Sequence, residues 1–303
     1  MEEIKPAFLE NNVPICFSAN DTYVPLLAVT IKSIIENSSP EKNYDIVILM
    51  TSINDENQLN LRKLIASHQN FSIRFVNVGP YVYGYNFYTD ADPTNTKFTD
   101  EIYYRVLVPS LMKTYEKVLF FDADLLILDD VSKLYDSDIS GYLVGAVRDY
   151  EGIANCYHKN YEITKYRINE LGITRFDDYF NSGVLLMNIE MFNKAFSTTA
   201  LLELSVSKNW RQFEQDVFNF LCKESVCILD ASWNFLEDYE GTYHKLPERL
   251  FNEFLKSEKS PKIVHFAGRR KPWIYLGSKH NKTFWKTAEQ TPFESELKKY
   301  LEE

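Results

Sequence analysis

The chain has 303 residues, of which 45% are apolar and 15% aromatic, so it can bury a large core. Its formal net charge is −10 and its basic residues are scattered, which argues against nucleic acid or an anionic membrane surface as the main partner. The polar start, residues 1–12, lacks a secretory signal, and no apolar run approaches the roughly 20 residues of a spanning helix. We therefore expect a cytoplasmic protein with at most peripheral contact at the inner face of the membrane.

The cysteines predict a reducing compartment. Their spacing matches neither a zinc site nor a thioredoxin-type pair, and Cys16 sits inside an apolar run, as a small core residue does. We expect free thiols at Cys16, Cys156, Cys222 and Cys227.

The first part of the chain alternates between strand and helix patterns. Short apolar runs predict strands at Pro14–Ser18, Tyr44–Met50 and Ser72–Val78. Stretches with helical periodicity predict helices at Tyr23–Glu36 and Glu56–Ala66. Such alternation is typical of an α/β protein with a mostly parallel, Rossmann-like sheet between covering helices.

The remaining elements continue this α/β pattern. The segment Gly79–Asp100 is aperiodic and long, which predicts a functional lid. Further strands are expected at Val118–Phe121, Val184–Asn188, Val226–Leu229 and Ile263–Phe266, and further helices at Thr99–Leu107, Asn160–Leu171 and Glu214–Leu221. We expect one catalytic domain, residues 1–273, with a small helical and aromatic C-terminal extension, residues 274–303, packed on it.

A pattern of two aspartates separated by one residue occurs three times, so the pattern alone selects none of them. The pairs are Asp90/Asp92, Asp122/Asp124 and Asp136/Asp138. The first and last lie in polar surroundings, where solvated carboxylates are expected. Only Asp122 ends a fully apolar strand, and ligands of open α/β sheets gather at the carboxyl ends of strands.

Residues two apart in an extended chain point to the same side, so the carboxylates of Asp122 and Asp124 are expected to converge. Their repulsion and desolvation favour a neutralising cation, and a hard ion such as Mn²⁺ or Mg²⁺ suits oxygen ligands. The alternative is a carboxylate pair that caps local backbone groups.

A second motif supports the cation. His265 ends a predicted strand, and Gly268 and Lys271 follow before Pro272. A lone histidine is usually structural. Together these residues supply an imidazole ligand, a glycine that permits close backbone approach and an ammonium for phosphate charge.

With these motifs in view, the sequence resembles glycosyltransferase family 8, the retaining enzymes that include bacterial lipopolysaccharide galactosyl- and glucosyltransferases and glycogenin. The resemblance runs from about Pro14 to Phe293. It rests on six motifs in family order, namely Phe17–Tyr23, Tyr104–Arg105, Asp122–Asp124, Phe180–Asn188, Glu214–Asp216 and His265–Trp273.

The resemblance implies a GT-A fold and a role for each motif. Asp122, Asp124 and His265 would be the metal ligands, and Lys271 and the Gly268 backbone would hold the diphosphate. The implied nucleotide contacts are Tyr23 stacked on uracil, Asn20 and Thr22 at its edge, and Ala19, Ala123 and Ser182 in the same site. Arg105, Asn181 and Asp216 would grip the donor sugar, with Gln215 closest to the anomeric carbon.

Two positions depart from the family pattern. The family often has an acidic residue at Asn20 and an amide at Thr22, so the base contacts here differ. The Asn20 carbonyl offers an acceptor for the N3 proton of uracil. Taken singly, Tyr23, Arg105 and Asn181 also have structural readings, as a helix-start aromatic, a surface cation and a turn cap.

The resulting hypothesis is a metal-dependent retaining enzyme that transfers a hexose, glucose or galactose, from a UDP-sugar to a glycan, glycoprotein or glycolipid. A neutral Gln215 favours front-face attack, and Asp216 is the better nucleophile on chemical grounds. One rival is a sugar-nucleotide nucleotidyltransferase, but Phe17–Tyr23 contains no glycine for its phosphate loop. Another is a non-catalytic sugar-nucleotide-binding protein. The sequence is compatible with a homodimer.

Overall fold

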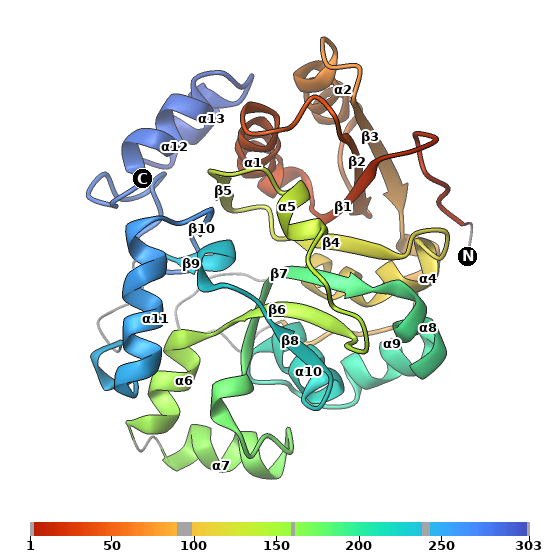
Figure 1. Ribbon diagram of the computed structural model, residues 1–303. Helices are drawn as coiled ribbons and strands as arrows, with labels where there is room; N and C mark the ends of the chain where they lie inside the picture. The colour runs from red at the N-terminus through yellow and green to blue at the C-terminus, as the bar shows by residue number, and fades with distance from the viewer. Residues whose placement is uncertain (1–2, 90–98, 159–160, 238–242, 302–303) are drawn as a thin grey trace.

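Seven strands form the central sheet of the computed structural model, in the order β3-β2-β1-β4-β7-β6-β8 (Figure 1). The structure describes residues 3–89, 99–158, 161–237 and 243–301. The strands are β1 (Asn12–Ser18), β2 (Asn43–Met50), β3 (Phe71–Asn77), β4 (Lys117–Phe121), β6 (Val144–Arg148), β7 (Phe180–Asn188) and β8 (Val226–Ile228).

The predicted mostly parallel sheet is confirmed, with one exception in direction. Strand β1 pairs in parallel with β2 and β4, β2 with β3, and β6 with β8. Strand β7 runs antiparallel to both of its neighbours, β4 and β6. The strand order reverses between β1 and β4, and the carboxyl ends of the strands at such a switch point border the crevice where α/β proteins bind ligands.

A second, three-stranded sheet has the order β5-β10-β9, with β5 (Leu125–Ile127), β10 (Ile263–His265) and β9 (Phe235–Leu236). After β4 the chain turns at Asp122–Asp124 and enters β5 of the second sheet. Strand β10 pairs antiparallel with β5, so that His265 lies opposite Leu125. This pairing brings the C-terminal part of the chain next to Asp124.

Helices cover both faces of the central sheet, and the sheet divides the core into two clusters. Residues of α1 (Val24–Glu36) and α2 (Asp55–Ile65) pack in one cluster, and those of α4 (Val108–Leu111), α8 (Ile189–Ala195) and α9 (Thr198–Val206) in the other. The other helices are α3 (Gly79–Val82), α5 (Ser132–Tyr135), α6 (Tyr150–Tyr157), α7 (Tyr161–Asn169), α10 (Phe213–Cys222), α11 (Glu248–Lys259), α12 (Asn281–Ala288) and α13 (Glu294–Lys299). Strand side chains are buried on both sides, as in the fully covered run Val13–Phe17.

The segment after residue 273 attaches through an aromatic cluster. Phe284 of α12 packs edge-on against Phe266, 5.7 Å between ring centroids, and beside Trp273 at 5.4 Å. Thr287 of α12 also donates a hydrogen bond to Glu36 at the end of α1. The C-terminal helices therefore rest on α1 and on the loop that follows β10.

One predicted helix has a tighter winding than expected. Residues Asp100–Leu107 form a 3₁₀ helix, η2, before α4 begins at Val108. Pro109 lies in the first turn of α4, where its missing N–H costs no helical hydrogen bond. The other 3₁₀ helices are η1 (Asp21–Tyr23), η3 (Phe176–Asp178), η4 (Ala231–Asn234) and η5 (Tyr243–Lys245).

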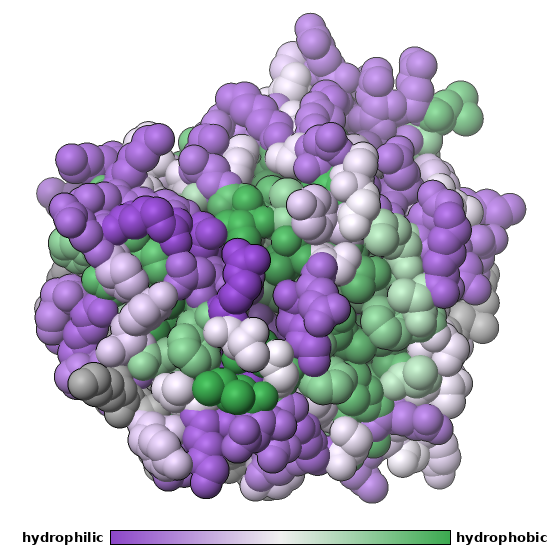
Figure 2. All heavy atoms as spheres, turned by 60° about the horizontal axis from the view of Figure 1, so that its bottom comes forward, coloured by the Kyte–Doolittle hydropathy of each residue, from purple (hydrophilic) through white to green (hydrophobic). Residues whose placement is uncertain are grey.

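The surface has both polar and apolar regions. Figure 2 shows one face on which apolar side chains gather across the middle and hydrophilic ones surround them. No helix in the described parts of the chain is both long enough and apolar enough to span a bilayer. The four cysteines are free thiols, as predicted.

Candidate metal and nucleotide site

Three predicted ligands meet where the two sheets join. Asp122 directly follows β4, Asp124 directly precedes β5, and His265 ends β10. One ligand atom from each lies within 4.8 Å of the others. The Nε2 atom of His265 is 3.7 Å from Oδ2 of Asp122 and 3.4 Å from Oδ1 of Asp124. The structure therefore brings both aspartates and the histidine to one point.

The two competing acidic pairs have no such arrangement in the described residues. Asp136 pairs with Lys42 at the surface, and Asp138 accepts a hydrogen bond from the Ser140 backbone in an exposed turn. Asp90 and Asp92 lie outside the described residues, as does much of the predicted lid.

Gly183 of β7 forms the floor beneath the ligands. Its carbonyl accepts a hydrogen bond from the Asp122 N–H at 2.9 Å. A Cβ at this position would lie 2.2 Å from Cε1 of His265 and 2.8 Å from Oδ2 of Asp122. Only glycine therefore allows the imidazole and the carboxylate to approach this closely. Two carboxylates and one imidazole around a glycine floor fit a divalent cation of the Mn²⁺ or Mg²⁺ type.

Lys271 neutralises one of the carboxylates. Its Nζ lies 2.7 Å from Oδ2 of Asp124, whose side chain is 12% exposed. Burial acts to raise the pKa of Asp124, but the charge of Lys271 beside the carboxylate opposes it, and the pKa lies well below the usual range. Asp124 is therefore ionised and ready to bind a cation.

Arg105 neutralises the other carboxylate from beneath. The side chain is 2% exposed, and its guanidinium lies over the Phe120 ring. One Nη donates to Oδ1 of Asp122 at 2.7 Å and the other to the Ser182 carbonyl at 2.6 Å. Its Nε donates to the Ile102 carbonyl. Most of its N–H groups are thus engaged by the protein, which favours a role in holding Asp122.

Glu214 completes this charge group from the start of α10. Its carboxylate lies 3.3 Å from the Arg105 guanidinium and accepts a hydrogen bond from Ser182. Burial nevertheless raises the pKa of Glu214 to about 7, with the nearby charge of Asp122 acting in the same direction. The preceding residue, Phe213, has φ of 48°, a left-handed conformation that is costly for a bulky side chain. This strained helix start presents Glu214 and Gln215 toward the site.

A chain of amide hydrogen bonds links the metal histidine to Gln215. Nδ1 of His265 lies 3.0 Å from Oδ1 of Asn234, and Nδ2 of Asn234 donates to Oδ1 of Asn181 at 2.8 Å. Asn181 in turn donates to Oε1 of Gln215 at 3.1 Å, and Gln215 donates to Asp149 at 2.9 Å. Since a carbonyl oxygen only accepts, this network assigns the imidazole proton to Nδ1 and leaves Nε2 bare toward the aspartates.

The family model described as glycosyl transferase family 8 matches residues 14–277. The chain belongs to glycosyl transferase family 8. General stress protein A of Bacillus subtilis is 26% identical over 84% of this chain and 85% of its own length. The lipopolysaccharide 1,2-glucosyltransferase of Escherichia coli is 23% identical over 88% of this chain and 76% of its own.

Solved structures support the same assignment. The bifunctional glycosyltransferase WbbM superposes with a TM-score of 0.86 at 27% identity, covering 99% of this chain and 53% of WbbM. The galactosyltransferase LgtC, solved with donor and acceptor sugar analogues, superposes with a TM-score of 0.73 at 21% identity, covering 92% of this chain and 96% of LgtC. The predicted family and GT-A fold are confirmed, and this family 8 protein is a glycosyltransferase.

The predicted base contacts of the family 8 enzyme lie after β1. Ala19 is buried, Thr22 is exposed, and Asn20 caps η1 with its Oδ1, which accepts from the backbone N–H groups of Thr22 and Tyr23 at 3.1 and 3.3 Å. Burial, with the charges of Asp124, Asp122 and Glu101, raises the pKa of Tyr23 to about 12. Tyr23 therefore lies within the field of both metal aspartates.

Asp216 is held by other protein groups and is not one of the clustered ligands of this family 8 site. Its carboxylate is fully buried and accepts hydrogen bonds from the hydroxyls of Tyr166 and Tyr179, each at 2.8 Å, and from the Gln212 backbone at 2.9 Å. Burial raises its pKa. The structure thus gives Asp216 a set of protein partners and does not bring it into the group formed by Asp122, Asp124 and His265.

The remaining predicted residues lie close to the ligands. The carbonyl of Ala123, between the two aspartates, accepts from the Thr30 hydroxyl of α1 at 2.7 Å, which fixes the turn that carries them. Ser182 lies between Arg105 and Glu214. Gly268 is half-buried in the loop from β10 to Lys271.

Sequence reasoning missed four residues of the site: Asn234, Asp149, Glu214 and Gly183. Glu214 and Gly183 fall inside quoted family motifs, so the motifs contained a signal that residue-by-residue reasoning left unused. Asp149 follows β6 as the cap of α6, and Asn234 precedes β9. Neither position shows a pattern that indicates its partner.

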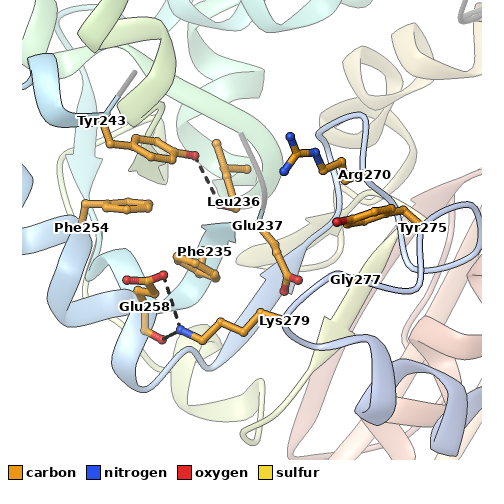
Figure 3. Close-up of a pocket in the computed structure, with 10 residues that line it drawn as sticks. All are labelled: Phe235, Leu236, Glu237, Tyr243, Phe254, Glu258, Arg270, Tyr275, Gly277 and Lys279. Atoms are coloured by element: carbon orange, nitrogen blue, oxygen red, sulfur yellow. Dashed lines mark hydrogen bonds and ion pairs between the residues drawn. The ribbon is translucent and has the colours of Figure 1, made fainter. Parts of the chain in front are cut away.

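A cavity of about 270 Å³ lies beside the His265–Trp273 loop (Figure 3). Its aromatic side is the stack of Tyr243 on Phe254, 3.9 Å between ring centroids, with Phe235 next to it. On the opposite side Arg270 lies over the ring of Tyr275, which is 43% exposed. Phe235 and Leu236, which line the cavity, form strand β9, and Leu236 pairs with His265.

Proposed function

We propose that this family 8 enzyme is a metal-dependent, retaining hexosyltransferase that transfers glucose or galactose from a UDP-sugar to a saccharide acceptor. The observation that carries the proposal is the convergence of Asp122, Asp124 and His265 with Lys271 bound to one of the carboxylates. This set offers a ligand group for a divalent cation and a separate cation for phosphate.

When bound, a divalent cation would offset the negative charge that builds on the leaving diphosphate. Lys271 contributes in the same direction. Its 2.7 Å contact with Asp124 holds the ammonium beside the ligand group before donor arrives. Lys271 then exchanges this carboxylate for a phosphate oxygen, which stabilises charge that develops only as the bond breaks.

Arg105 acts in this proposal as the support of Asp122. The guanidinium already bonds Asp122, the Ser182 carbonyl and the Ile102 carbonyl. It therefore keeps the Asp122 carboxylate in place beside the other ligands. Contact with the donor sugar falls to Asn181 and Gln215, whose amides belong to the hydrogen-bonded chain from His265.

Two observations support front-face attack over a covalent intermediate. Gln215 is neutral, and its amide is held at both ends, by Asn181 and Ser182 on the oxygen and by Asp149 and Tyr179 on the nitrogen. Asp216, the better nucleophile by chemistry, has its oxygens bound by two tyrosine hydroxyls. In this proposal Gln215 is therefore a neutral side chain in a fixed orientation beside the reacting sugar, and it does not act as a nucleophile.

The cavity of Figure 3 is the proposed acceptor site. Aromatic rings pack against the apolar faces of sugars, and the partly exposed side chains of Glu258 and Lys279, which line the cavity, offer hydrogen bonds to hydroxyls. Its position beside β9 and the Lys271 loop supports an acceptor site near the proposed donor.

The rival functions receive less support. The loop after β1 has no glycine for a nucleotidyltransferase phosphate site. A non-catalytic binding protein has no need for an intact ligand set with Lys271 in place.

A donor-hydrolysis screen tests the proposal. The purified chain is incubated with UDP-glucose, UDP-galactose and other nucleotide sugars, with Mn²⁺ or with EDTA, and released UDP is measured. Hydrolysis of a UDP-hexose that needs Mn²⁺ and disappears in Asp124→Asn supports the proposal. Equal hydrolysis with EDTA, or full activity of Asp124→Asn, contradicts it.

A further inference from the structure

Glu101 occupies a distinctive position above the nucleotide side of the crevice. It lies in η2 and reaches over the carboxyl ends of β1 and β2, the two strands that Asn20 and Thr51 follow. Oε2 of Glu101 lies 3.3 Å from Nδ2 of Asn20, and Oε1 lies 3.3 Å from the Thr51 hydroxyl. Its charge acts on Tyr23, as the charges of the metal aspartates do. Glu101 therefore faces the same space as Tyr23.

The Glu101 carboxylate has few partners for a buried charge. The residue is 9% exposed, and its two hydrogen bonds, both at 3.3 Å, are long and come from neutral donors. No lysine, arginine or histidine in the described parts of the chain forms an ion pair with it. A carboxylate accepts up to about four hydrogen bonds, and one removed from water without a strong donor is costly. This geometry leaves acceptor capacity for a ligand.

Asn20 does not supply that acceptor. Its Oδ1 already accepts from the N–H groups of Thr22 and Tyr23, and its Nδ2 donates to Glu101 and to the Thr99 hydroxyl. The two lone pairs of the amide carbonyl are thereby used within the η1 cap. Asn20 instead holds the carboxylate of Glu101 in position from one side, and Thr51 holds it from the other.

We propose that Glu101 reads the base of the donor nucleotide by accepting the N3–H of uracil, and so selects uridine over cytidine nucleotides. The inference rests on the proposed UDP-sugar donor. Uracil carries a hydrogen on N3, whereas N3 of cytosine is an acceptor that the carboxylate repels. Base selection here comes from a residue of η2 that is more than seventy positions away from the strand β1 motif.

Nucleotide binding by the full chain tests this assignment. Calorimetry with Mn²⁺ gives the dissociation constants of UDP and CDP for the unchanged protein, for Glu101→Gln and for Asp100→Asn. Asp100 is exposed and adjacent, so its variant removes the same charge without touching the crevice. We expect Glu101→Gln to reduce the preference for UDP over CDP by about 10- to 100-fold and Asp100→Asn to leave it unchanged. An unchanged preference in a folded Glu101→Gln protein overturns the assignment.

A second measurement needs no variant. UDP methylated at N3 lacks the hydrogen in question, whereas UDP methylated at C5 keeps it. We expect N3-methyl-UDP to bind the unchanged protein at least about tenfold more weakly than 5-methyl-UDP. Equal affinities overturn the role of Glu101 while leaving UDP-dependent transfer intact. If the protein binds no uridine nucleotide at all, the proposed donor fails first, so the two failures are distinguishable.

Discussion

The Nδ1 atom of His265 lies 3.0 Å from Oδ1 of Asn234, so a residue outside the ligand set decides how the imidazole faces the two aspartates. An acceptor on the nitrogen that does not bind the metal fixes the tautomer of a metal-binding histidine and its orientation. Asn234 is 1% exposed, so this contact is sheltered from competing water.

Removing this acceptor is expected to weaken cation binding. Asn234→Ala should raise the dissociation constant for Mn²⁺ by about 10- to 100-fold, because the ring loses the bond that orients it. Titration followed by electron paramagnetic resonance measures the constant directly. Asn234→Asp keeps the acceptor and loses the donor to Asn181, so it should preserve Mn²⁺ affinity. If Asn234→Ala binds Mn²⁺ normally, the histidine does not depend on this contact.

A methyl group on the site floor should block the ligands. In Gly183→Ala the new Cβ would lie 2.2 Å from the His265 ring, and we expect Mn²⁺ binding to be lost together with about 1–3 kcal/mol of stability. Gly145→Ala is the matched control, because its Cβ would crowd Ile139 at 2.9 Å elsewhere in the sheet. That variant should lose stability and still bind Mn²⁺. Equal Mn²⁺ affinities in the two variants would exclude the floor role.

Loss of the ammonium should separate binding of metal from turnover. Lys271→Met removes the partner of Asp124 and the proposed phosphate contact, and kcat should fall by about 100-fold or more. Mn²⁺ affinity should hold or increase, because the lysine no longer competes for the carboxylate. Arg269→Met, an exposed cation two residues earlier, is the control and should retain activity. A normal kcat in Lys271→Met would remove lysine from the mechanism.

The buried carboxyl of Glu214 should make stability depend on pH. Burial raises its folded-state pKa to about 7, above the unfolded value, so its protonated form is favoured by folding. Its contribution is fully present below the unfolded pKa and is lost as the pH rises toward 7. Between pH 5 and pH 8, metal-free wild-type protein should lose on the order of 2 kcal/mol more unfolding free energy than Glu214→Gln. Urea unfolding at both pH values measures this difference, and parallel losses would argue against the raised pKa.

If the cavity binds the acceptor, a change in its lining should affect the acceptor KM and leave the donor reaction unchanged. Tyr275→Ala should raise the acceptor KM by about tenfold and leave donor hydrolysis unchanged, because the ring lines the cavity and touches none of the metal ligands. Tyr142→Ala is the control, because it removes a ring of nearly equal exposure, 42% against 43%, from the loop that precedes β6. Initial rates at varied acceptor concentration compare the two. A rise in the donor KM instead would indicate that this cavity binds the nucleotide sugar and not the acceptor.

The metal group was predictable because Asp122 and His265 each stand at the end of an apolar run and Asp124 is two residues from Asp122. Strand β4 ends before Asp122 and β10 ends at His265, so periodicity alone brought these residues to sheet edges. The resemblance to the family then indicated that these residues form one metal site. The direction of β7 was not predictable, since a continuous apolar run predicts burial and says nothing of whether its neighbours are parallel.

The supporting residues could not be predicted for a physical reason. Strand β5 has three residues and β9 has two, which is too short to show a period. Yet β5 begins directly after Asp124, and β9 begins directly after Asn234. Asn20 illustrates a different limit. Its residue type fits both a base contact and a helix cap, and only the hydrogen bonds to Thr22 and Tyr23 show that its carbonyl is used for the cap.

The metal group draws on strands separated by almost half of the chain, since Asp124 precedes β5 and His265 ends β10. A polypeptide that has formed only its first strands and helices has two carboxylates and no third ligand. Long-range closure between β5 and β10 is slow compared with local helix formation. Full Mn²⁺ affinity should thus arise late in refolding and serve as a time-resolved signal of native topology, distinct from the earlier rise in helix content.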